Sequence, residues 1–307
     1  MEFIKKNQEE ILTLREYKVR LDLSVPLLIY KGFSDTGFVK HCFTTRRGGC
    51  SEGIYASMNL SFTRGDQTES VKENFRRIAD AMNVDYNKFV FADQTHTTNI
   101  RAVTESDAGH GITKKKNFFD VDGLITNVPG LVLATFYADC VPLYFLDPVN
   151  KAIGLSHSGW RGTRNRMGRA TIEAMRKAYG TRAEDLMCAI GPSICRDCYE
   201  VGEEVAEQFL EEFKSKAEEL LWEKRMEEKA VSEGIDGTKV KQDVVLKKYQ
   251  LDLWRANEIV LEEAGVIPTN IATTNICTCC NAKLLFSHRA SQGKRGNLGA
   301  FLSLNDT

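Results

Sequence analysis

The sequence predicts an α+β fold in which helices flank mixed β-sheets. Apolar runs of strand length recur along the chain, and amphipathic helical runs lie between them. The two kinds of run do not alternate in the regular strand–helix–strand order that is typical of a parallel α/β protein. With 307 residues, 42% of them hydrophobic and 27% charged, the chain is long enough to form one large globular domain or two.

The predicted strands are short apolar runs bounded by turn residues. They are Val39–Thr44, Phe89–Ala92, Ile100–Thr104, Leu131–Tyr137, Val141–Leu146, Ala152–Leu155, Leu186–Ile190, Ile271–Cys277 and Leu298–Leu304. The turn-forming sequence Asp-Pro-Val-Asn joins the strand that ends at Leu146 to the strand that begins at Ala152. This pair therefore predicts a β-hairpin.

Three helices are predicted between these strands. The first has an apolar stripe at helical spacing, formed by Val71, Phe75, Ile78 and Met82. Asp66 is its predicted N-cap. The second covers Arg164–Tyr179 and the third covers Leu253–Ala264, and a glycine directly follows each of them.

The segment Lys214–Val240 differs from the rest of the chain. It is highly charged and helical in pattern, with few apolar residues, namely Leu220, Leu221, Trp222 and Met226. A solvated helical excursion explains this pattern. The alternative is a lid or a partner surface that uses Trp222.

Composition and motifs exclude several classes of function. The net charge of −1 gives no general attraction to nucleic acid or to an anionic membrane, so we expect neither as a partner. The first ten residues lack the apolar run of a secretory signal, and Asp139 and Pro142 interrupt the longest apolar stretch, Leu131–Leu146. We therefore expect a cytoplasmic protein with mostly reduced cysteines. The chain matches neither the dinucleotide-binding glycine motif nor the P-loop.

Three residues next to predicted strands suggest a metal site. Cys140 stands just before the first strand of the hairpin and His157 just after the second, so the hairpin brings them together. His96 follows another strand and is flanked by small polar residues. Two nitrogens and one sulfur, with a fourth position open, are typical of catalytic zinc. The alternative for Cys140 is that it packs as a small hydrophobic residue.

A series of motifs resembles the bacterial laccase-domain family, the YfiH-like proteins that are also called polyphenol oxidases. In order, they are FTTRRGGCSEGIYASMNLSF, GD, QTH, DGLIT, ADCVPLYFLDP, GLSHSGWRGT, IGPSIC, CYEVG and FSHR. The resemblance begins at about Phe43 and continues to the C-terminus, with the segment around residues 214–240 as an apparent helical insertion. It implies a single YfiH-like domain over residues 1–307, with two central mixed sheets flanked by helices.

The resemblance also implies a metal, generally zinc, bound by His96, Cys140 and His157. Copper is possible at the same site, because divalent copper binds such ligands more strongly. The implied activities are phosphorolysis of adenosine, inosine, guanosine and methylthioadenosine, and deamination of adenosine. The partners would then be purine nucleosides and phosphate, and the oligomeric state stays open.

Arginines near the motifs are candidates for binding phosphate, because a guanidinium group matches its geometry. They are Arg46, Arg161 and Arg289. Asn59, Gln94 and Asp122 are weaker candidates for polar contacts to the sugar or base. The alternative for any one arginine is a surface charge.

Three other functions stay open beside the nucleoside enzyme. One is a metal-free hydrolase of peptidoglycan precursors, with Cys140 as nucleophile and His157 as base. Another is a binding module whose metal is structural. The third is the copper-binding polyphenol oxidase of the family name. Five histidines are too few for it, because a blue-copper centre and a multi-copper cluster together need more imidazoles than that.

The remaining cysteines permit two interpretations. Cys195-x-x-Cys198 has the spacing of zinc ligands, and a second cluster comprises Cys277, Cys279 and Cys280. They form either a second zinc site or unconnected thiols near strand ends.

Overall fold

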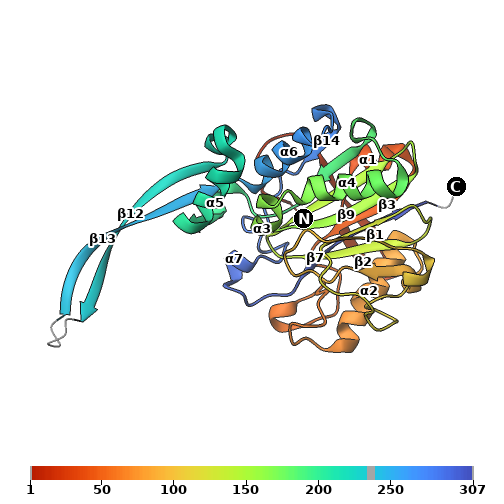
Figure 1. The fold of residues 1–307 in the computed structure, drawn as a ribbon. Coiled ribbons are helices and arrows are strands. Elements are labelled where there is room, and N and C mark those ends of the chain that lie inside the picture. The colour runs from red at the N-terminus through yellow and green to blue at the C-terminus, as the bar shows by residue number, and fades with distance from the viewer. Residues whose placement is uncertain (1, 234–238, 306–307) are drawn as a thin grey trace.

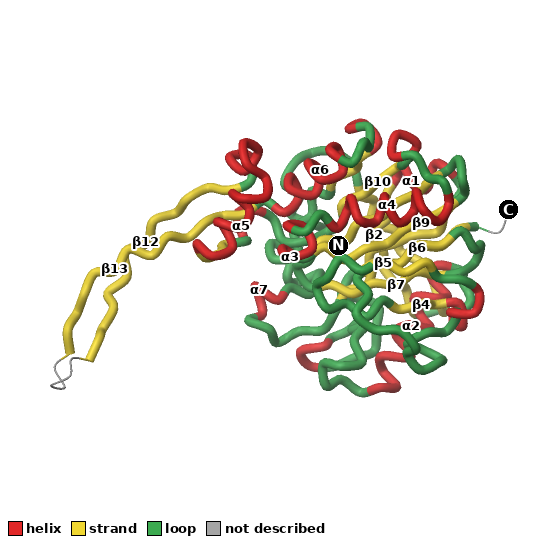
Figure 2. Tube along the Cα trace, in the orientation of Figure 1, coloured by secondary structure: helices red, strands yellow, loops and turns green. Residues whose placement is uncertain are grey.

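Two six-stranded sheets and the helices that cover their outer faces form the body of the protein. The computed structural model describes residues 2–233 and 239–305. Figures 1 and 2 show the sheets stacked in the body, helices on either side of the stack, and a long hairpin that projects from it. No helix in the described part of the chain is both long and apolar enough to cross a bilayer.

The first sheet has the strand order β1-β2-β3-β15-β7-β4. Its strands are β1 (Leu12–Arg20), β2 (Leu23–Tyr30), β3 (Val39–Thr44), β4 (Phe89–Phe91), β7 (Val132–Tyr137) and β15 (Leu298–Leu304). Only β4 and β7 pair in parallel; the other neighbours are antiparallel.

The second sheet has the order β14-β10-β8-β9-β6-β5. Its strands are β5 (Ile100–Ala102), β6 (Gly123–Thr126), β8 (Val141–Asp147), β9 (Ala152–Ser158), β10 (Met187–Ile190) and β14 (Ile271–Thr273). The pairs at its two edges are parallel and the central pairs are antiparallel, so both sheets are mixed, as predicted. The predicted hairpin is β8–β9, which aligns Pro142 with His157.

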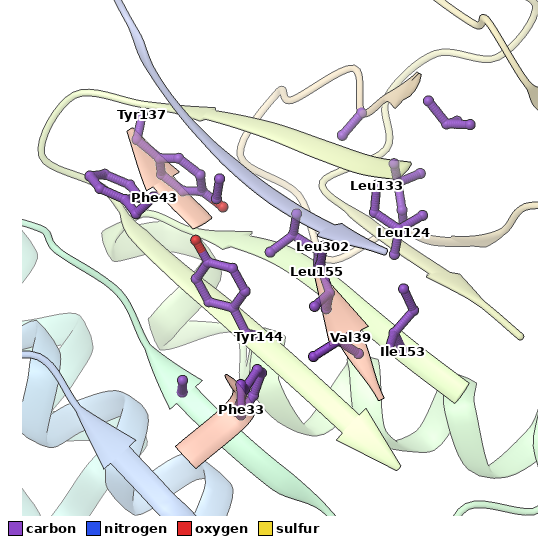
Figure 3. Packing of buried hydrophobic residues seen from close by; sticks show 14 of the residues in the cluster. Phe33, Val39, Phe43, Leu124, Leu133, Tyr137, Tyr144, Ile153, Leu155 and Leu302 are labelled. Carbon is purple, nitrogen blue, oxygen red and sulfur yellow. The ribbon is translucent and has the colours of Figure 1, made fainter. Parts of the chain in front are cut away.

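Apolar side chains from both sheets fill the space between them (Figure 3). Three buried tyrosines also cross this core to donate hydrogen bonds to carbonyl oxygens of the other sheet. Tyr137 reaches Ser156 at 3.1 Å and Tyr144 reaches Cys42 at 2.9 Å. Tyr30 reaches Ile190, the last residue of β10 in the second sheet, at 2.8 Å. Each ring thus buries apolar area while its hydroxyl stays paired.

Helices cover the outer face of each sheet. Helix α2 (Thr68–Met82) packs on the first sheet, and α4 (Met167–Tyr179) and α6 (Leu253–Glu263) pack on the second. The other α-helices are α1 (Lys31–Thr36), α3 (Trp160–Arg164), α5 (Glu203–Phe213) and α7 (His288–Ser291). Short 3₁₀-helices are η1 (Gly53–Tyr55), η2 (Tyr86–Lys88), η3 (Glu105–Asp107), η4 (Ala183–Asp185), η5 (Arg196–Cys198), η6 (Lys214–Glu219) and η7 (Pro268–Asn270).

The helix ends follow local chemistry, with one correction. Gly180 ends α4 in the left-handed conformation that glycine favours, with a φ of 76°. Asp252 caps α6 by accepting hydrogen bonds from two backbone N–H groups. Asp66 is not the N-cap of α2: Gln67 takes that position, and the Asp66 carboxylate instead accepts a hydrogen bond from the N–H of Gln67.

The prediction of a helical insertion at residues 214–240 is wrong. Among its described residues only η6, at the start, is helical. Strands β12 (Leu221–Glu233) and β13 (Lys239–Leu251) then form an antiparallel hairpin that joins β11 (Glu200–Gly202) in a third sheet. Residues 234–238 of the predicted insertion lie outside the described residues. The hairpin is the arm at the left of Figure 1. Continuous pairing of 13 residue pairs overrides the helix propensity of its Glu and Lys residues.

Candidate functional site

His96, Cys140 and His157 meet at one end of the β8–β9 hairpin. Cys140 directly precedes β8, His157 lies near the end of β9, and His96 lies in the loop after β4 with a φ of 69°. The Cys140 Sγ lies 3.9 Å from the His96 Nε2. One ligand atom from each of the three residues lies within 4.8 Å of the other two. The structure therefore brings the three predicted ligands together.

Asp122, the first residue of the DGLIT motif, lies directly before β6 and contacts this group. Its buried carboxylate accepts a hydrogen bond of 2.7 Å from the Nδ1 of His157. It also accepts three backbone N–H bonds of 2.9–3.1 Å, from Thr95, His96 and Thr97. Burial would raise the pKa of Asp122, but the hydrogen bond and charge of His157 lower it to about 2.

The contact with Asp122 also decides which nitrogen of His157 can bind a metal. Because Nδ1 pairs with the carboxylate, Nε2 is left to face the other two ligands. A carboxylate that orients a histidine in this way is a common partner of metal-binding imidazoles. Both oxygens of the Asp122 carboxylate are engaged by His157 and the His96 loop, and the predicted contact of Asp122 to the sugar or base stays a prediction.

The charges of the group favour a thiolate. Burial alone would raise the pKa of Cys140, but the charge of His157 and hydrogen bonds from both histidines lower it to about 6. Burial would lower the pKa of His157, but Cys140 and Asp122 raise it to about 9. A thiolate next to an imidazole that is oriented by a carboxylate suits either metal binding or nucleophilic attack.

Gly159, from the SHSGWRG motif, permits the close approach of His96 and Cys140. A Cβ atom at this position would lie 2.9 Å from the His96 Cδ2 and 3.1 Å from the Cys140 Sγ. A side chain at this position would crowd both His96 and Cys140, so glycine is the residue that fits here.

The metal-ligand group faces a cavity of about 420 Å³, a size that suits a small molecule. One wall is aromatic, formed by Phe62, Phe91, Phe136 and Tyr137. Gln94 also lines the cavity, and its amide group exchanges two hydrogen bonds with the backbone of Phe136, at 2.7 and 2.8 Å. Gln94 thereby fixes this wall, and its predicted contact to the sugar or base stays a prediction.

Another part of the cavity wall is basic. Arg64, Lys116 and Arg295 line it, although Lys116 pairs with the carboxylate of Asp93, which also lines the cavity; none of them was predicted as a site residue. Arg295 is only 8% exposed, and its Nε has no hydrogen-bond partner in the described structure. Burial and the neighbouring charge of Arg64 lower the pKa of Arg295 to about 10. A buried, incompletely paired guanidinium group is suited to binding an anion.

The structure places Arg46 and Asn59 outside the cavity lining. Arg46 donates hydrogen bonds of 2.9 Å to the carbonyls of Ala56 and Ala282, and its guanidinium lies over the Phe286 ring. Asn59 is fully buried and bonds to its own loop and to the backbone of Asn297. Both residues brace loops, so this placement does not support the predicted contacts to substrate.

Arg161 and Arg289 also lie outside the residues that line the cavity. Arg161 stacks over Trp160, with its guanidinium carbon 4.3 Å from the ring centroid. Arg289 donates its backbone N–H to Asp139 at 2.7 Å and a side-chain N–H to the Glu200 carbonyl at 2.8 Å. Their role in binding phosphate stays a prediction.

A second metal-ligand group lies apart from the first one. The sulfurs of Cys195, Cys198, Cys277 and Cys280 all lie within 4.8 Å of one another. These four thiols form one group, so the interpretation of them as unconnected thiols near strand ends is wrong. Among the residues that the structure describes, this group and the His96–Cys140–His157 group both suggest metal binding.

The five histidines do not assemble a multi-copper centre, and all of them lie in the described part of the chain. His41 is buried and accepts a hydrogen bond from the N–H of Tyr30. His110 stacks on Phe118 with ring centroids 3.7 Å apart, and His288 is the first residue of α7. Two histidines are left for the metal-ligand group, so the oxidase alternative lacks the ligands for a trinuclear copper cluster.

Comparison with known families identifies the chain. The family model of the multi-copper polyphenol oxidoreductase laccases matches residues 40–305. The chain belongs to this family. The match covers both six-stranded sheets except β1 and β2, and it includes both metal-ligand groups.

Individual relatives of the laccase family agree with this assignment. The purine nucleoside phosphorylase YlmD of Bacillus subtilis is 32% identical over 265 residues, which are 86% of this chain and 88% of that protein. The human purine nucleoside phosphorylase LACC1 is 32% identical over 273 residues, 87% of this chain and 56% of the longer human protein.

Solved structures of the family confirm the YfiH-like fold. The hypothetical protein YfiH of Bacillus licheniformis superposes with a TM-score of 0.79 at 31% identity, over 93% of this chain and 98% of that one. YlmD from Geobacillus stearothermophilus gives 0.76 at 30% identity, over 94% and 99% of the two chains.

Proposed function

We propose that this protein is a zinc-dependent purine nucleoside phosphorylase. The observation that carries the proposal is the position of the His96–Cys140–His157 group: it is oriented by Asp122 and faces a cavity with one aromatic and one basic part. The names of relatives that are 32% identical supply the substrate class. Adenosine, inosine, guanosine and methylthioadenosine are the proposed nucleosides.

The metal assignment rests on the donor set. Two imidazoles and one thiolate, with His157 backed by a carboxylate, fit zinc with a fourth position left open. A zinc ion bound there would act as a Lewis acid toward an oxygen of the substrate or toward water. Copper is an alternative occupant of the same ligands.

The aromatic and basic parts of the cavity wall suit different parts of the substrates. The rings of Phe62, Phe136 and Tyr137 offer flat apolar surfaces against which a purine base can pack. Arg64 and Arg295 supply positive charge for phosphate. In phosphorolysis, a phosphate oxygen forms a bond to C1′ of the ribose while the bond from C1′ to the base nitrogen breaks. The base leaves with that electron pair and takes up a proton, which gives free purine and ribose 1-phosphate.

We extend the proposal to deamination of adenosine at the same cavity. There, water adds at C6 of the purine, ammonia leaves, and inosine forms. The His-x-Glu and Pro-Cys-x-x-Cys motif of the base-editing deaminases is absent from the sequence. Deamination would therefore use a different set of residues, and we assign it to the His96–Cys140–His157 group because that group faces the cavity.

One observation favours a second candidate, a cysteine hydrolase. Cys140, His157 and Asp122 form a thiol–imidazole–carboxylate series, and the pKa of Cys140 is lowered to about 6. In that reaction Cys140 would attack an amide carbonyl and His157 would protonate the leaving amine. His96 has no part in this mechanism, and this separates the two candidates.

The test is the dependence of the products on phosphate. Zinc-loaded protein is incubated with adenosine, with and without inorganic phosphate, and the products are separated by chromatography. With phosphate, the proposal expects ribose 1-phosphate equal in amount to adenine and hypoxanthine together, because inosine formed by deamination is cleaved as well; without phosphate it expects only inosine. Release of base that does not depend on phosphate, or no nucleoside chemistry at all, contradicts the proposal.

A further inference from the structure

The four sulfurs of Cys195, Cys198, Cys277 and Cys280 form a group separate from the cavity. Each pair has two residues between its members, so the order is Cys-x₂-Cys followed by a second Cys-x₂-Cys, as in structural zinc sites. The first pair lies at η5 after β10, and the second lies in the loop after β14. The strands β10 and β14 pair in parallel, so both loops leave the same edge of the second sheet.

The distances agree with four ligands around one ion. The Cys198 and Cys280 sulfurs are 3.5 Å apart, and all four sulfurs lie within 4.8 Å of one another. Zinc–sulfur bonds of about 2.3 Å in a tetrahedron place sulfurs about 3.8 Å apart. The distance of 3.5 Å between the Cys198 and Cys280 sulfurs is too long for a disulfide bond, which is about 2.05 Å.

The surroundings of the sulfurs favour thiolates. The backbone N–H groups of Cys195 and Cys280 both point at the Cys277 sulfur, at 3.2 and 3.4 Å. Two N–H donors aimed at one sulfur stabilise negative charge on it, as they do for a metal-bound thiolate. Lys6 lies against η5, where its ammonium pairs with the Asp197 carboxylate at 2.9 Å.

The two loops that carry the sulfurs also hold Asp139, the residue before Cys140. Thr278 donates a hydrogen bond of 2.6 Å to one oxygen of the Asp139 carboxylate. Ile194, next to Cys195, donates its N–H to the Asp139 carbonyl at 3.0 Å. Asp139 itself has a φ of 87°, which is unfavourable for a residue with a side chain. These contacts hold it there and thereby fix the position of Cys140.

We propose that a second, structural zinc ion is bound by Cys195, Cys198, Cys277 and Cys280. This ion joins the loops after β10 and β14 and holds Asp139 next to the His96–Cys140–His157 group, which is the catalytic group of the proposed function. Four protein ligands leave no position for substrate or water, so this zinc does not take part in the reaction. Its contribution is to the stability of the fold and to the placement of Cys140.

The experiment counts zinc per chain by elemental analysis in four proteins purified without added metal. Wild type is expected to hold two zinc ions. Cys140→Ser, which removes one ligand of the His96–Cys140–His157 group, and Cys198→Ser/Cys280→Ser, which removes two ligands of the four-cysteine group, are each expected to hold one. Cys279→Ser is the matched control, because Cys279 lies in the same loop but outside the group, and it is expected to hold two.

A second measurement applies if the double variant does not fold. Cys140→Ser protein is loaded with cobalt in place of zinc, and its absorption spectrum is expected to show the strong bands of tetrahedral cobalt bound by four thiolates. Its thermal unfolding midpoint is expected to fall when a chelator removes that ion. A Cys140→Ser protein with no zinc and no such spectrum would overturn the proposal, as would a Cys198–Cys280 disulfide found by mass spectrometry. Neither readout requires enzymatic activity.

Discussion

The two metal-ligand groups of this protein differ in donor atoms, surroundings and access. The His96–Cys140–His157 group, for which we propose the catalytic role, combines two imidazoles with one thiolate. A buried carboxylate contacts it from one side, and it includes an exposed histidine, His96, beside a cavity. The four-cysteine group offers sulfur ligands alone, its Cys277 sulfur accepts two backbone N–H hydrogen bonds, and its members come from two loops. Three ligands with an open side suit chemistry, and four ligands suit structure.

The connection between the two groups explains why one chain would carry both. Cys140 directly follows Asp139, whose side chain and backbone bond to residues adjacent to the four cysteines. The proposed structural zinc would therefore cross-link the loops that hold Asp139 and, next to it, Cys140. Loss of the first group should abolish activity in a folded protein, whereas loss of the second should first reduce stability.

The largest expected effect is that of removing a catalytic ligand. His96→Ala should lose one zinc ion and lower kcat/KM for phosphorolysis by more than about 100-fold, because losing a ligand costs more than losing its hydrogen-bond partner. Thr98→Ala in the same loop is the control and should keep activity and zinc. Activity and metal content are measured on the same samples. A fully active His96→Ala protein would favour the cysteine hydrolase instead.

Asp122→Asn should have the next largest effect on the catalytic group. The amide cannot stabilise the His157 imidazole as the carboxylate does, so zinc affinity or activity should fall by about 10- to 100-fold. Asp147→Asn is the matched control, because Asp147 is equally buried but lies at the other end of the β8–β9 hairpin. The four-cysteine group should keep its zinc in both variants. Equal losses in the two variants would show a general effect on folding.

The stability of the fold should decrease in acid independently of either metal group. Burial lowers the pKa of His41 from 6.5 to about 4, although a backbone hydrogen bond from Tyr30 opposes this. The unfolded chain therefore binds a proton that the folded chain does not, and stability that is complete above pH 6.5 declines as the pH falls toward 4. By pH 4.5 the loss from His41 is about 2 kcal/mol.

The variant His41→Gln isolates this term, because its amide oxygen can still accept the Tyr30 hydrogen bond. Urea unfolding of wild type and variant is compared between pH 7 and 4.5, and the decline should be shallower in the variant. Parallel curves would assign the acid sensitivity to other groups. The result also shows how much of any metal loss in acid reflects the fold as a whole.

Arg295→Gln should have the smallest of these effects and one limited to phosphate. Losing one charged hydrogen-bond donor should raise the KM for phosphate about tenfold while zinc content stays unchanged. Arg169→Gln on the exposed surface of α4 is the control. A change in zinc content, or an unchanged KM for phosphate, would remove Arg295 from the phosphate site.

The catalytic group was predictable because its geometry is mostly local. A β-hairpin pairs its two ends, so a cysteine before one strand and a histidine near the end of the other must meet. The third ligand, His96, came from its polar neighbours and from the family motif. The mixed sheets followed from the irregular order of strands and helices.

The rest depended on packing between distant segments. Arg295 reaches the cavity from a loop just before the last strand, and no pattern around it indicates that position. The two cysteine pairs meet only because β10 and β14 are neighbours in the sheet. The projecting hairpin was missed because its charged residues favour a helix in isolation, whereas pairing with the opposite strand favours β-structure.

The reactivity of each cysteine toward an alkylating reagent tests the comparison of the two groups most directly. Native protein is treated with the reagent while chelator is added stepwise, and mass spectrometry identifies the labelled cysteines. Half-buried Cys50 serves as the internal reference. The account predicts that Cys140 is protected at first and becomes labelled as activity is lost, and that the four-cysteine group reacts only at higher chelator. Rapid labelling of Cys140 before any chelator is added, with matching loss of activity, would contradict the account and identify Cys140 as a free nucleophile.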